Sequence, residues 1–468
     1  MIHMYQIDYK KPIHVYFVGI GGISMSGLAE ILMSRGFRVS GSDRDKSSIT
    51  EALEHHGIKV FYGQKEENIT KDIDLAVFTA AIHPDNPEFR AVERLGIPHM
   101  TRAVLLGEIM RNYETPAAVS GTHGKTTTTS MLSEILINAG TDPTLSVGGI
   151  LKSISGNVRV GKSGCFVTEA CEYTNSFLSL FPKIGIILDI DADHLDFFKD
   201  INDIRHSFRR FAGLIPEDGT LIINSTIPDL NEITEGLKCH IVTYGSDSNS
   251  DYYPTDIIYD EHAHPTYTLH SRDLKSGNMM PDSRITLRIP GEHNIYNSMA
   301  AVAAADIYGV KRDITVSSLF TFEGTDRRFE LKGQFNGVTV IDDYAHHPTE
   351  IRATLNAALK YPHNKIWCVF QSHTYSRTKA LMHEFAEALT LADEVILADI
   401  YPARETDNLG ISAETLQKEI LNLGHPCYYF GSFDEIVNFA RKNCNKNDLL
   451  ITMGAGNVYE IGDALVKK

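Results

Sequence analysis

Short apolar runs alternate with longer stretches of helical periodicity along most of the chain. Strands that alternate with helices in this way predict parallel sheets covered by helices on both faces. A polar stretch over residues 246–284, rich in aspartate, serine and tyrosine, interrupts the pattern, and we expect irregular antiparallel excursions there. The clearest predicted strands lie at residues 15–18, 75–79, 117–119, 165–168, 184–188, 220–223, 338–341, 366–370, 394–397 and 449–452.

The alternation falls into three segments, and 468 residues are too many for one hydrophobic core. We predict an α/β protein of three domains. Residues 1–112 form a Rossmann-like N-terminal domain, and residues 113–325 form a central domain of the P-loop ATPase type. Residues 326–468 form a Rossmann-like C-terminal domain with a parallel sheet.

Charge and cysteine content narrow the classes of function. The net charge of −16 disfavours binding to nucleic acid or to an anionic membrane surface, because both need a cationic face. No apolar run approaches the ~18 residues that a membrane span requires. The six cysteines are scattered without a C-x-x-C pair, which favours reduced thiols in a cytoplasmic protein.

Residues 121–127, Gly-Thr-His-Gly-Lys-Thr-Thr, follow a predicted strand and precede a helical pattern. Glycines let backbone N–H groups converge on phosphate oxygens, and the helix N-terminus adds its positive dipole end. In such loops Lys125 reaches the terminal phosphates and the Thr126 hydroxyl holds Mg²⁺. Val119 stands where the common form of this loop has glycine, so the segment predicts a variant phosphate loop.

A second glycine loop, Gly19-Ile20-Gly21-Gly22-Ile23-Ser24, follows the first predicted strand. With Asp43 beyond the next strand, it is similar to a dinucleotide-binding fingerprint in which serine replaces the third glycine. A nicotinamide-dependent oxidoreductase is therefore one interpretation, although it leaves the loop at residues 121–127 unexplained.

Acidic, amide and imidazole side chains follow several predicted strands, and ligands gather at the carboxyl ends of parallel strands. In the central domain Glu169, Glu172 and the 189–194 segment lie there; Glu169 and His194 are candidates for a divalent metal near Thr126. Helix capping is the alternative for these acids. Asn294 and Asn297 share one side of a helix start, where they could contact a nucleotide or cap the helix.

The C-terminal domain carries the densest polar clusters. Arg327 and Arg328 stand at the predicted junction and could clamp a phosphate when domains close. Residues 342–348, Asp-Asp-Tyr-Ala-His-His-Pro, and residues 371–377, Gln-Ser-His-Thr-Tyr-Ser-Arg, follow neighbouring predicted strands. Zinc is a rival ligand for these histidines, but no thiolate or H-x-x-x-H spacing supports it.

Together with residues 399–405, these segments resemble the Mur ligases of peptidoglycan precursor synthesis, in the family's order and over nearly the whole chain. The resemblance is closest to the member that joins L-alanine to UDP-N-acetylmuramate. It implies an N-terminal domain for the UDP substrate, a central domain for ATP with Mg²⁺, and a C-terminal domain for the amino acid. It also implies a cytoplasmic enzyme that binds neither nucleic acid nor membrane and is a monomer or homodimer.

The resemblance assigns roles to individual residues. It implies that Lys125, His194, His346 and Arg377 are catalytic, that Thr126, Glu169 and His194 hold the metal, and that Tyr344, His346 and Arg377 bind the amino acid. The UDP substrate is expected at Gly19, Gly21, Gly22 and Asp43. ATP is expected at Gly121, Thr122, His123, Gly124, Lys125, Thr126, Thr127, Asn294, Asn297, Arg328 and Asp343.

Two positions depart from the family pattern: Ser24 replaces a glycine, and Thr374 stands where an arginine is expected. Arg377 then remains as the expected clamp for the amino-acid carboxylate. Other interpretations stay open, namely a related ligase that adds a different amino acid or a peptide, and a non-enzymatic protein gated by ATP.

Overall fold

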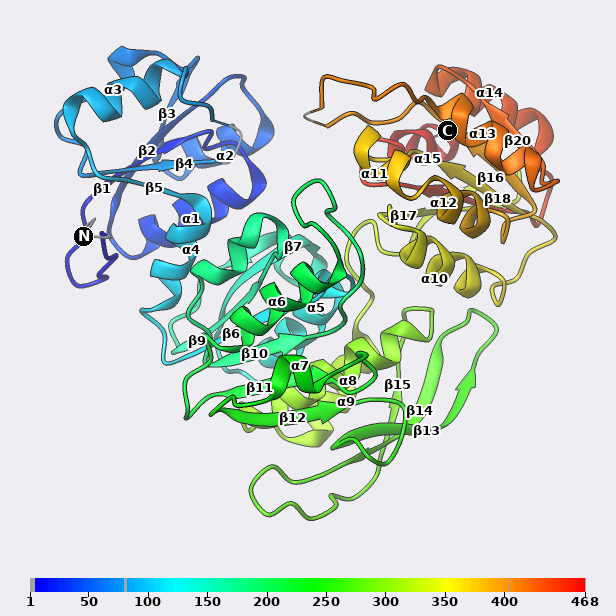
Figure 1. Ribbon diagram of the computed structural model, residues 1–468, viewed down its shortest axis with the longest axis horizontal. Helices are drawn as coiled ribbons and strands as arrows, with labels where there is room; N and C mark the ends of the chain where they lie inside the picture. The colour runs from blue at the N-terminus through cyan, green and yellow to red at the C-terminus, as the bar shows by residue number, and fades with distance from the viewer. Residues whose placement is uncertain (1–4, 80–81, 404, 468) are drawn as a thin grey trace.

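The computed structural model describes residues 5–79, 82–403 and 405–467. Three α/β units follow one another along the chain, each built on its own sheet. In Figure 1 the blue N-terminal unit and the yellow-to-red C-terminal unit lie apart from each other, each beside the cyan-to-green middle unit. The predicted fold class of three α/β domains is confirmed. The boundaries predicted after residues 112 and 325 stay predictions.

The N-terminal sheet has the strand order β3-β2-β1-β4-β5, and every pairing in it is parallel. The β1 strand is apolar and wholly buried because helices cover both faces of the sheet, as expected for parallel sheets. The strands are β1 (His14–Val18), β2 (Arg38–Asp43), β3 (Lys59–Tyr62), β4 (Leu75–Phe78) and β5 (His99–Thr101); the helices are α1 (Ile23–Ser34), α2 (Ser48–His55), α3 (Pro87–Leu95) and α4 (Arg102–Met110).

The middle sheet has the order β15-β14-β13-β12-β11-β10-β6-β9-β7-β8. Its strands from β13 to β7 in that order pair in parallel, whereas β8 pairs antiparallel with β7, and β14 pairs antiparallel with both β13 and β15. The strands are β6 (Thr115–Ser120), β7 (Thr144–Leu151), β8 (Gly156–Arg159), β9 (Cys165–Glu169), β10 (Ile184–Ile187), β11 (Thr220–Asn224), β12 (His240–Tyr244), β13 (Tyr252–Tyr259), β14 (Pro265–Ser271) and β15 (Ser283–Thr286); the α-helices are α5 (Lys125–Asn138), α6 (Ile201–Ala212), α7 (Asn231–Thr234), α8 (His293–Ile307) and α9 (Arg312–Thr321).

The polar stretch at residues 246–284 holds antiparallel strands, as expected: β13 pairs with β14, and β14 pairs with β15. In β14 the burial alternates strictly between buried and half-buried residues, which is the period of a strand with one face on the core. The register of β13 shifts between Thr255 and Ile258, so the excursion is partly irregular, whereas β14 is more regular than its polar composition suggests.

The C-terminal sheet has the order β16-β17-β21-β18-β19-β20. It is parallel except at one edge, where β16 runs antiparallel to β17, so the expected parallel sheet carries one antiparallel edge strand. The strands are β16 (Glu330–Phe335), β17 (Val338–Asp343), β18 (Ile366–Phe370), β19 (Glu394–Leu397), β20 (Cys427–Tyr429) and β21 (Leu449–Met453); the helices are α10 (Pro348–Ala358), α11 (Tyr375–Ala380), α12 (Met382–Leu389), α13 (Ala413–Asn422), α14 (Phe433–Asn443) and α15 (Tyr459–Val466).

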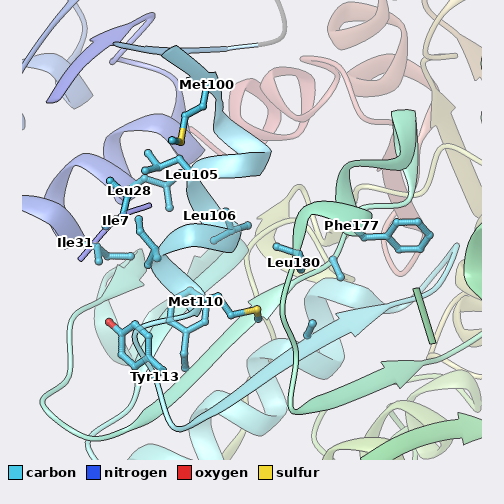
Figure 2. Close-up of a cluster of buried hydrophobic side chains, with 14 of the residues drawn as sticks. Ile7, Leu28, Ile31, Met100, Leu105, Leu106, Met110, Tyr113, Phe177 and Leu180 are labelled. Carbon is cyan, nitrogen blue, oxygen red and sulfur yellow. The ribbon is translucent and has the colours of Figure 1, made fainter. Parts of the chain in front are cut away.

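One hydrophobic core crosses from the N-terminal unit into the middle unit. Figure 2 shows α4 at its centre, with Leu106 and Met110 directed toward Phe177 and Leu180 of the middle unit. The backbones also approach closely, since a Cβ placed on Gly107 would lie 1.9 Å from the carbonyl oxygen of Ser179. This junction is therefore dry and closely packed.

Among the described helices, none is long and apolar enough to cross a membrane.

Candidate active site between the middle and C-terminal domains

The phosphate loop joins β6 to α5 at the carboxyl end of the middle sheet. Gly121 has a φ of 144° and Gly124 a φ of 80°, which are backbone conformations that favour glycine. A Cβ on Gly124 would lie 2.5 Å from Oδ1 of Asn297, so an amide of α8 contacts the loop backbone. Thr122 and Thr127 are buried within the same turn. The predicted strand, loop and helix order is present.

The Lys125 side chain folds back onto its own loop. Its ammonium donates to the Gly121 carbonyl at 2.5 Å and to the two Glu172 oxygens at 2.8 and 3.1 Å. The Glu172 side chain is only 3% exposed, so the pair is almost dry. Although burial opposes the charge, the Glu172 carboxylate raises the pKa of Lys125. Lys125 is therefore a fixed cation at the mouth of the loop.

The predicted metal ligands fall into two places. A Cβ on Gly149 would lie 3.2 Å from the Thr126 methyl, and the neighbouring Gly148 donates its N–H to Glu169 at 2.6 Å. Thr126 and Glu169 thus converge on the same two residues of β7, and a hydroxyl and a carboxylate oxygen are ligands that suit Mg²⁺. His194 lies instead on the other carboxylate, with Nε2 3.6 Å from Glu172. Burial lowers the pKa of His194, which favours a neutral imidazole.

A cavity of about 240 Å³ opens beside the phosphate loop, between the middle and C-terminal domains. Its walls combine side chains from the two domains, so it depends on how the domains meet. Many of the residues predicted to bind ATP line it, namely His123, Gly124, Thr127, Asn294, Asn297, Arg328 and Asp343.

Polar groups in this cavity are held in place by hydrogen bonds. Asn297 donates to Asn294 at 3.0 Å, and Asn294 donates to the Pro290 carbonyl at 2.7 Å. Asp343 accepts from the N–H groups of Phe329 and Ala345 at 2.7 and 2.8 Å. Burial raises the pKa of Asp343 to about 6. Fixed amide and carboxyl groups of this kind can orient the base and the ribose of a nucleotide.

A second cavity, of about 170 Å³, lies nearby between the 192–196 loop and α11. Arg377 enters it from the C-terminal domain and pairs with Asp193 of the middle domain, through Nε at 3.0 Å and Nη2 at 3.3 Å. Both side chains are about nine-tenths buried. Although burial opposes the charge, Arg377 lowers the pKa of Asp193. A guanidinium held in this way can donate its remaining N–H groups to a small carboxylate.

The other predicted amino-acid residues stand next to this cavity. The His346 ring lies 5.9 Å from that of His373, and the Tyr344 ring lies 5.4 Å from that of His346. Arg327 and Arg328 both stack on Tyr344, at 4.8 and 5.1 Å from its centroid. Burial lowers the pKa of His346 to about 4, so its imidazole is neutral at pH 7.

Loop 371–377 has a strained backbone. Thr374, one of the two departures from the family pattern, has φ 69° and ψ 143°, which is unusual for a β-branched residue. Its strain is offset by a carboxylate that sequence reasoning missed: Glu405 accepts the N–H groups of Tyr375 and Ser376 at 2.5 and 3.1 Å. Glu405 ends the predicted 399–405 segment, and Arg404 of that segment lies outside the described residues.

The predicted UDP-substrate residues are in the N-terminal domain, away from these cavities. Gly19, with a φ of 85°, starts the turn after β1, and Gly22 precedes the first residue of α1. The N–H of Gly21 donates to the Asp43 carboxylate at 2.8 Å, which closes the loop onto the end of β2. No side chain caps α1. A helix N-terminus without a side-chain cap can bind an anion through its backbone N–H groups.

Glu350 is a site residue that the sequence analysis did not identify. It lies in the first turn of α10 and contacts both His346 and His123. The i, i+4 spacing of His346 and Glu350 was the available signal. The contact with His123 has no local signal, because it joins residues of two domains.

Three family models together match most of the chain. They are described as Mur ligase family, catalytic domain, over residues 14–114; Mur ligase middle domain, over residues 119–305; and Mur ligase, glutamate ligase domain, over residues 327–456.

Curated relatives are similar over their full length. A UDP-N-acetylmuramate–L-alanine ligase of Lachnospira eligens is 57% identical, over 99% of this chain and 100% of its own. A ligase of the same name from Caldanaerobacter subterraneus is 48% identical, over 99% of each chain. Among solved structures, a UDP-N-acetylmuramate-alanine ligase of Thermotoga maritima has a TM-score of 0.79 at 27% identity, over 97% of this chain and 98% of its own. A murein peptide ligase of Psychrobacter arcticus has a TM-score of 0.72 at 25% identity, over the same shares.

Proposed function

Because the chain belongs to the Mur ligase family, we propose that it joins L-alanine to UDP-N-acetylmuramate at the expense of ATP, in peptidoglycan precursor synthesis. The observation that carries the proposal is the 57% identity, over the full chain, to a relative named for this reaction. The two adjoining cavities support it, since one has the walls of a nucleotide site and the other holds a buried arginine. The oxidoreductase interpretation loses its basis, because the first glycine loop lies within the family match.

In the first step the muramoyl carboxylate attacks the γ-phosphate of ATP, and an acyl phosphate and ADP result. Two anions meet, so positive charge must offset their repulsion. Lys125 supplies it by exchanging one Glu172 oxygen for a phosphate oxygen. Thr126 and Glu169 would hold Mg²⁺, which supplies further charge neutralisation when it is bound. His194, which lies beside Glu172 instead, is the candidate for a ligand at the second place.

The nucleotide and the UDP substrate approach from two sides. Asn294, Asn297, Arg328 and Asp343 orient ATP, with Asp343 at the ribose and Arg328 at the phosphates. On the N-terminal domain, the pyrophosphate of the UDP substrate meets the N-terminus of α1 near Gly22, while Asp43 fixes the preceding loop through Gly21.

In the second step the amine of L-alanine attacks the acyl carbon and phosphate leaves. Arg377 binds the alanine carboxylate, and Tyr344 and His346 shape the pocket. With a pKa of about 4, His346 is too weak a base to deprotonate an α-ammonium group, whose pKa is about 8. It therefore orients the neutral amine and accepts the proton after attack, when the nitrogen of the tetrahedral adduct has become far more acidic.

Both cavities lie where two domains meet, so closure of this junction assembles the site and excludes water from the acyl phosphate. We place the reaction in the cytoplasm, which agrees with six cysteines that are all free.

The test is a panel of amino acids with UDP-N-acetylmuramate and ATP, scored by ADP release. We expect L-alanine to stimulate release most, with weaker responses to glycine and L-serine, since one methyl group is worth only ~1–3 kcal/mol. The peptide L-alanyl-γ-D-glutamyl-meso-diaminopimelate belongs in the panel, because a similar ligase of Neisseria meningitides is named for it. If L-alanine gave no stimulation, the proposal would be overturned.

A further inference from the structure

Glu350 connects the phosphate loop to the amino-acid pocket. Its side chain is 15% exposed and sits in the first turn of α10, between a histidine of the middle domain and a histidine of its own domain. We infer that Glu350 is a positioning residue that fixes the orientation and tautomer of His346 relative to the ATP-binding loop. The inference rests on the proposed function, since it concerns how His346 handles the amine.

The two carboxylate oxygens are divided between the two partners. Oε1 lies 3.2 Å from Nδ1 of His123, in the phosphate loop. Oε2 lies 3.2 Å from Nδ1 of His346 and accepts the His346 backbone N–H at 3.0 Å. One carboxylate therefore holds both the ring and the backbone of His346, and at the same time contacts the loop that receives ATP.

The acceptors around each ring determine where its protons are. His123 faces carboxylates on both sides, because Nε2 lies 3.3 Å from Asp191, so both of its nitrogens donate. The ring is then an imidazolium, in agreement with a pKa that its carboxylate neighbours raise despite burial. Its positive charge balances Glu350 at the edge of a cavity that must receive phosphates.

His346 has the opposite arrangement. Nδ1 faces the Tyr344 carbonyl at 3.0 Å as well as Glu350, and both of these are acceptors. The hydrogen of the neutral ring therefore sits on Nδ1, and Nε2 carries the lone pair. Without the Glu350 carboxylate, only one carbonyl would select this tautomer. Glu350 thus keeps Nε2 ready to accept a proton.

Two further contacts tie the start of α10 to the middle domain. Thr349 donates to Asp191 at 2.7 Å, and His347 Nε2 lies 3.2 Å from the Ala192 carbonyl. The contact between His123 and Glu350 therefore forms only when these two domains are together, and it links the His346–Glu350 pair to the loop expected to receive ATP.

The test compares two nucleophiles on the same acyl phosphate. Hydroxylamine is neutral at pH 7.5 and has no carboxylate, so it needs neither His346 nor Arg377; it displaces phosphate and gives a hydroxamate. In Glu350→Gln, one oxygen cannot accept from both histidines. At saturating ATP, we expect alanine-dependent amide formation to fall by at least about tenfold, while hydroxamate formation stays within about twofold.

Glu387→Gln is the matched control, because Glu387 of α12 forms an exposed pair, at 3.2 Å, with Arg352, which lies on α10 as Glu350 does. Glu387→Gln should form the amide and the hydroxamate at the rates of the wild type. Glu350→Asp keeps the charge but is too short to span both histidines, and it should shift the product ratio in the same direction. If Glu350→Gln does not fold, the comparison of amide with hydroxamate can be made on Glu350→Asp instead.

Equal loss of amide and hydroxamate in both Glu350 variants would overturn the inference, since Glu350 would then act on ATP or on folding. Unchanged products would overturn it as well, because Glu350 would be only a favourable charge at a helix start. Failure of the proposed function looks different: the wild type itself would form hydroxamate but no alanine-dependent product.

Discussion

The middle domain meets its two neighbours through junctions of opposite chemistry. Toward the N-terminal domain, leucine, methionine and phenylalanine side chains of α4 and residues 173–180 form one continuous apolar core (Figure 2). Toward the C-terminal domain, the contacts are ionic and polar, with the Arg377–Asp193 and His123–Glu350 pairs among them. The same domain therefore has one dry junction and one charged junction.

The difference corresponds to what each junction must do. Apolar contact is non-directional and offers no charged group that a ligand could replace, so the junction at α4 fixes the position of the N-terminal domain. At the charged junction, two of the cations that are expected to bind substrate already have a carboxylate partner: Glu172 for Lys125 and Asp193 for Arg377. In the proposed reaction, phosphate and alanine carboxylate groups compete with these two carboxylates for Lys125 and Arg377. At the charged junction, a cation can therefore exchange its carboxylate partner for an anionic group of a substrate.

The largest expected effect is at Lys125. Lys125→Ala should lower ATP-dependent ligation by about 10²–10³-fold, because it removes a positioned cation from the phosphates. It also leaves Glu172 buried without its partner, which should lower the free energy of unfolding. Steady-state ADP release and thermal unfolding measure the two losses.

A second substitution separates these two losses. Lys125→Ala with Glu172→Gln should recover stability but not turnover, whereas recovery of turnover would show that Lys125 matters only as the partner of Glu172. Lys183→Ala, which breaks an exposed pair with Asp218 in the same domain, is the matched control and should leave both quantities unchanged.

The dry junction should respond in stability rather than in catalysis. Gly107→Ala places a methyl group 1.9 Å from the Ser179 carbonyl oxygen, so α4 must move, at a cost of about 3 kcal/mol. We expect a lower thermal unfolding midpoint, with KM values for ATP and L-alanine close to those of the wild type. Gly431→Ala, at an exposed position with only the Tyr429 hydroxyl 3.8 Å away, controls for the loss of glycine. A rise in the KM for L-alanine would show that the two junctions are coupled.

Features encoded within a few residues could be predicted from the sequence, and features that join distant segments could not. The phosphate loop depends on Gly121, Gly124 and Lys125, which lie within five positions of one another, so its strand, loop and helix order could be predicted. The partner of Arg377 lies 184 positions away, in another domain. The chain carries no local trace of such a pair, and only the fold brings it together.

Edge strands were also difficult to predict from the sequence. The β16 strand, Glu-Leu-Lys-Gly-Gln-Phe, is half-exposed and needs no apolar run, so its antiparallel pairing at Glu330–Phe335 was missed. Buried central strands such as β18 have the opposite property: five consecutive buried residues make them visible as apolar runs.

At the charged junction, His346 makes stability depend on pH. Its pKa is about 4 in the folded protein and about 6.5 when unfolded, so between these values the unfolded chain binds a proton that the folded chain does not. This contribution to stability is complete above pH 6.5 and is lost as the pH falls toward 4. Relative to His346→Asn, the wild type should lose about 2 kcal/mol between pH 7.5 and pH 5.

The single tryptophan makes this measurable, because Trp367 lies in β18 of the same domain as His346. Urea unfolding at the two pH values, followed by its fluorescence, reports that domain. An identical pH dependence in the wild type and the variant would mean that His346 is already protonated in the folded protein. That result would contradict its role as a proton acceptor.

The smallest effect we expect distinguishes the geometry of the charged junction from its charge. Arg377→Lys keeps one positive charge but cannot contact both oxygens of Asp193 and a substrate carboxylate together. We expect the KM for L-alanine to rise about tenfold, equivalent to about 1.4 kcal/mol, while the KM for ATP changes less than about twofold. Arg352→Lys, on the exposed face of α10, should change neither. An equal rise in both KM values would place Arg377 in domain closure rather than in amino-acid binding, since closure is shared by every ligand at this junction.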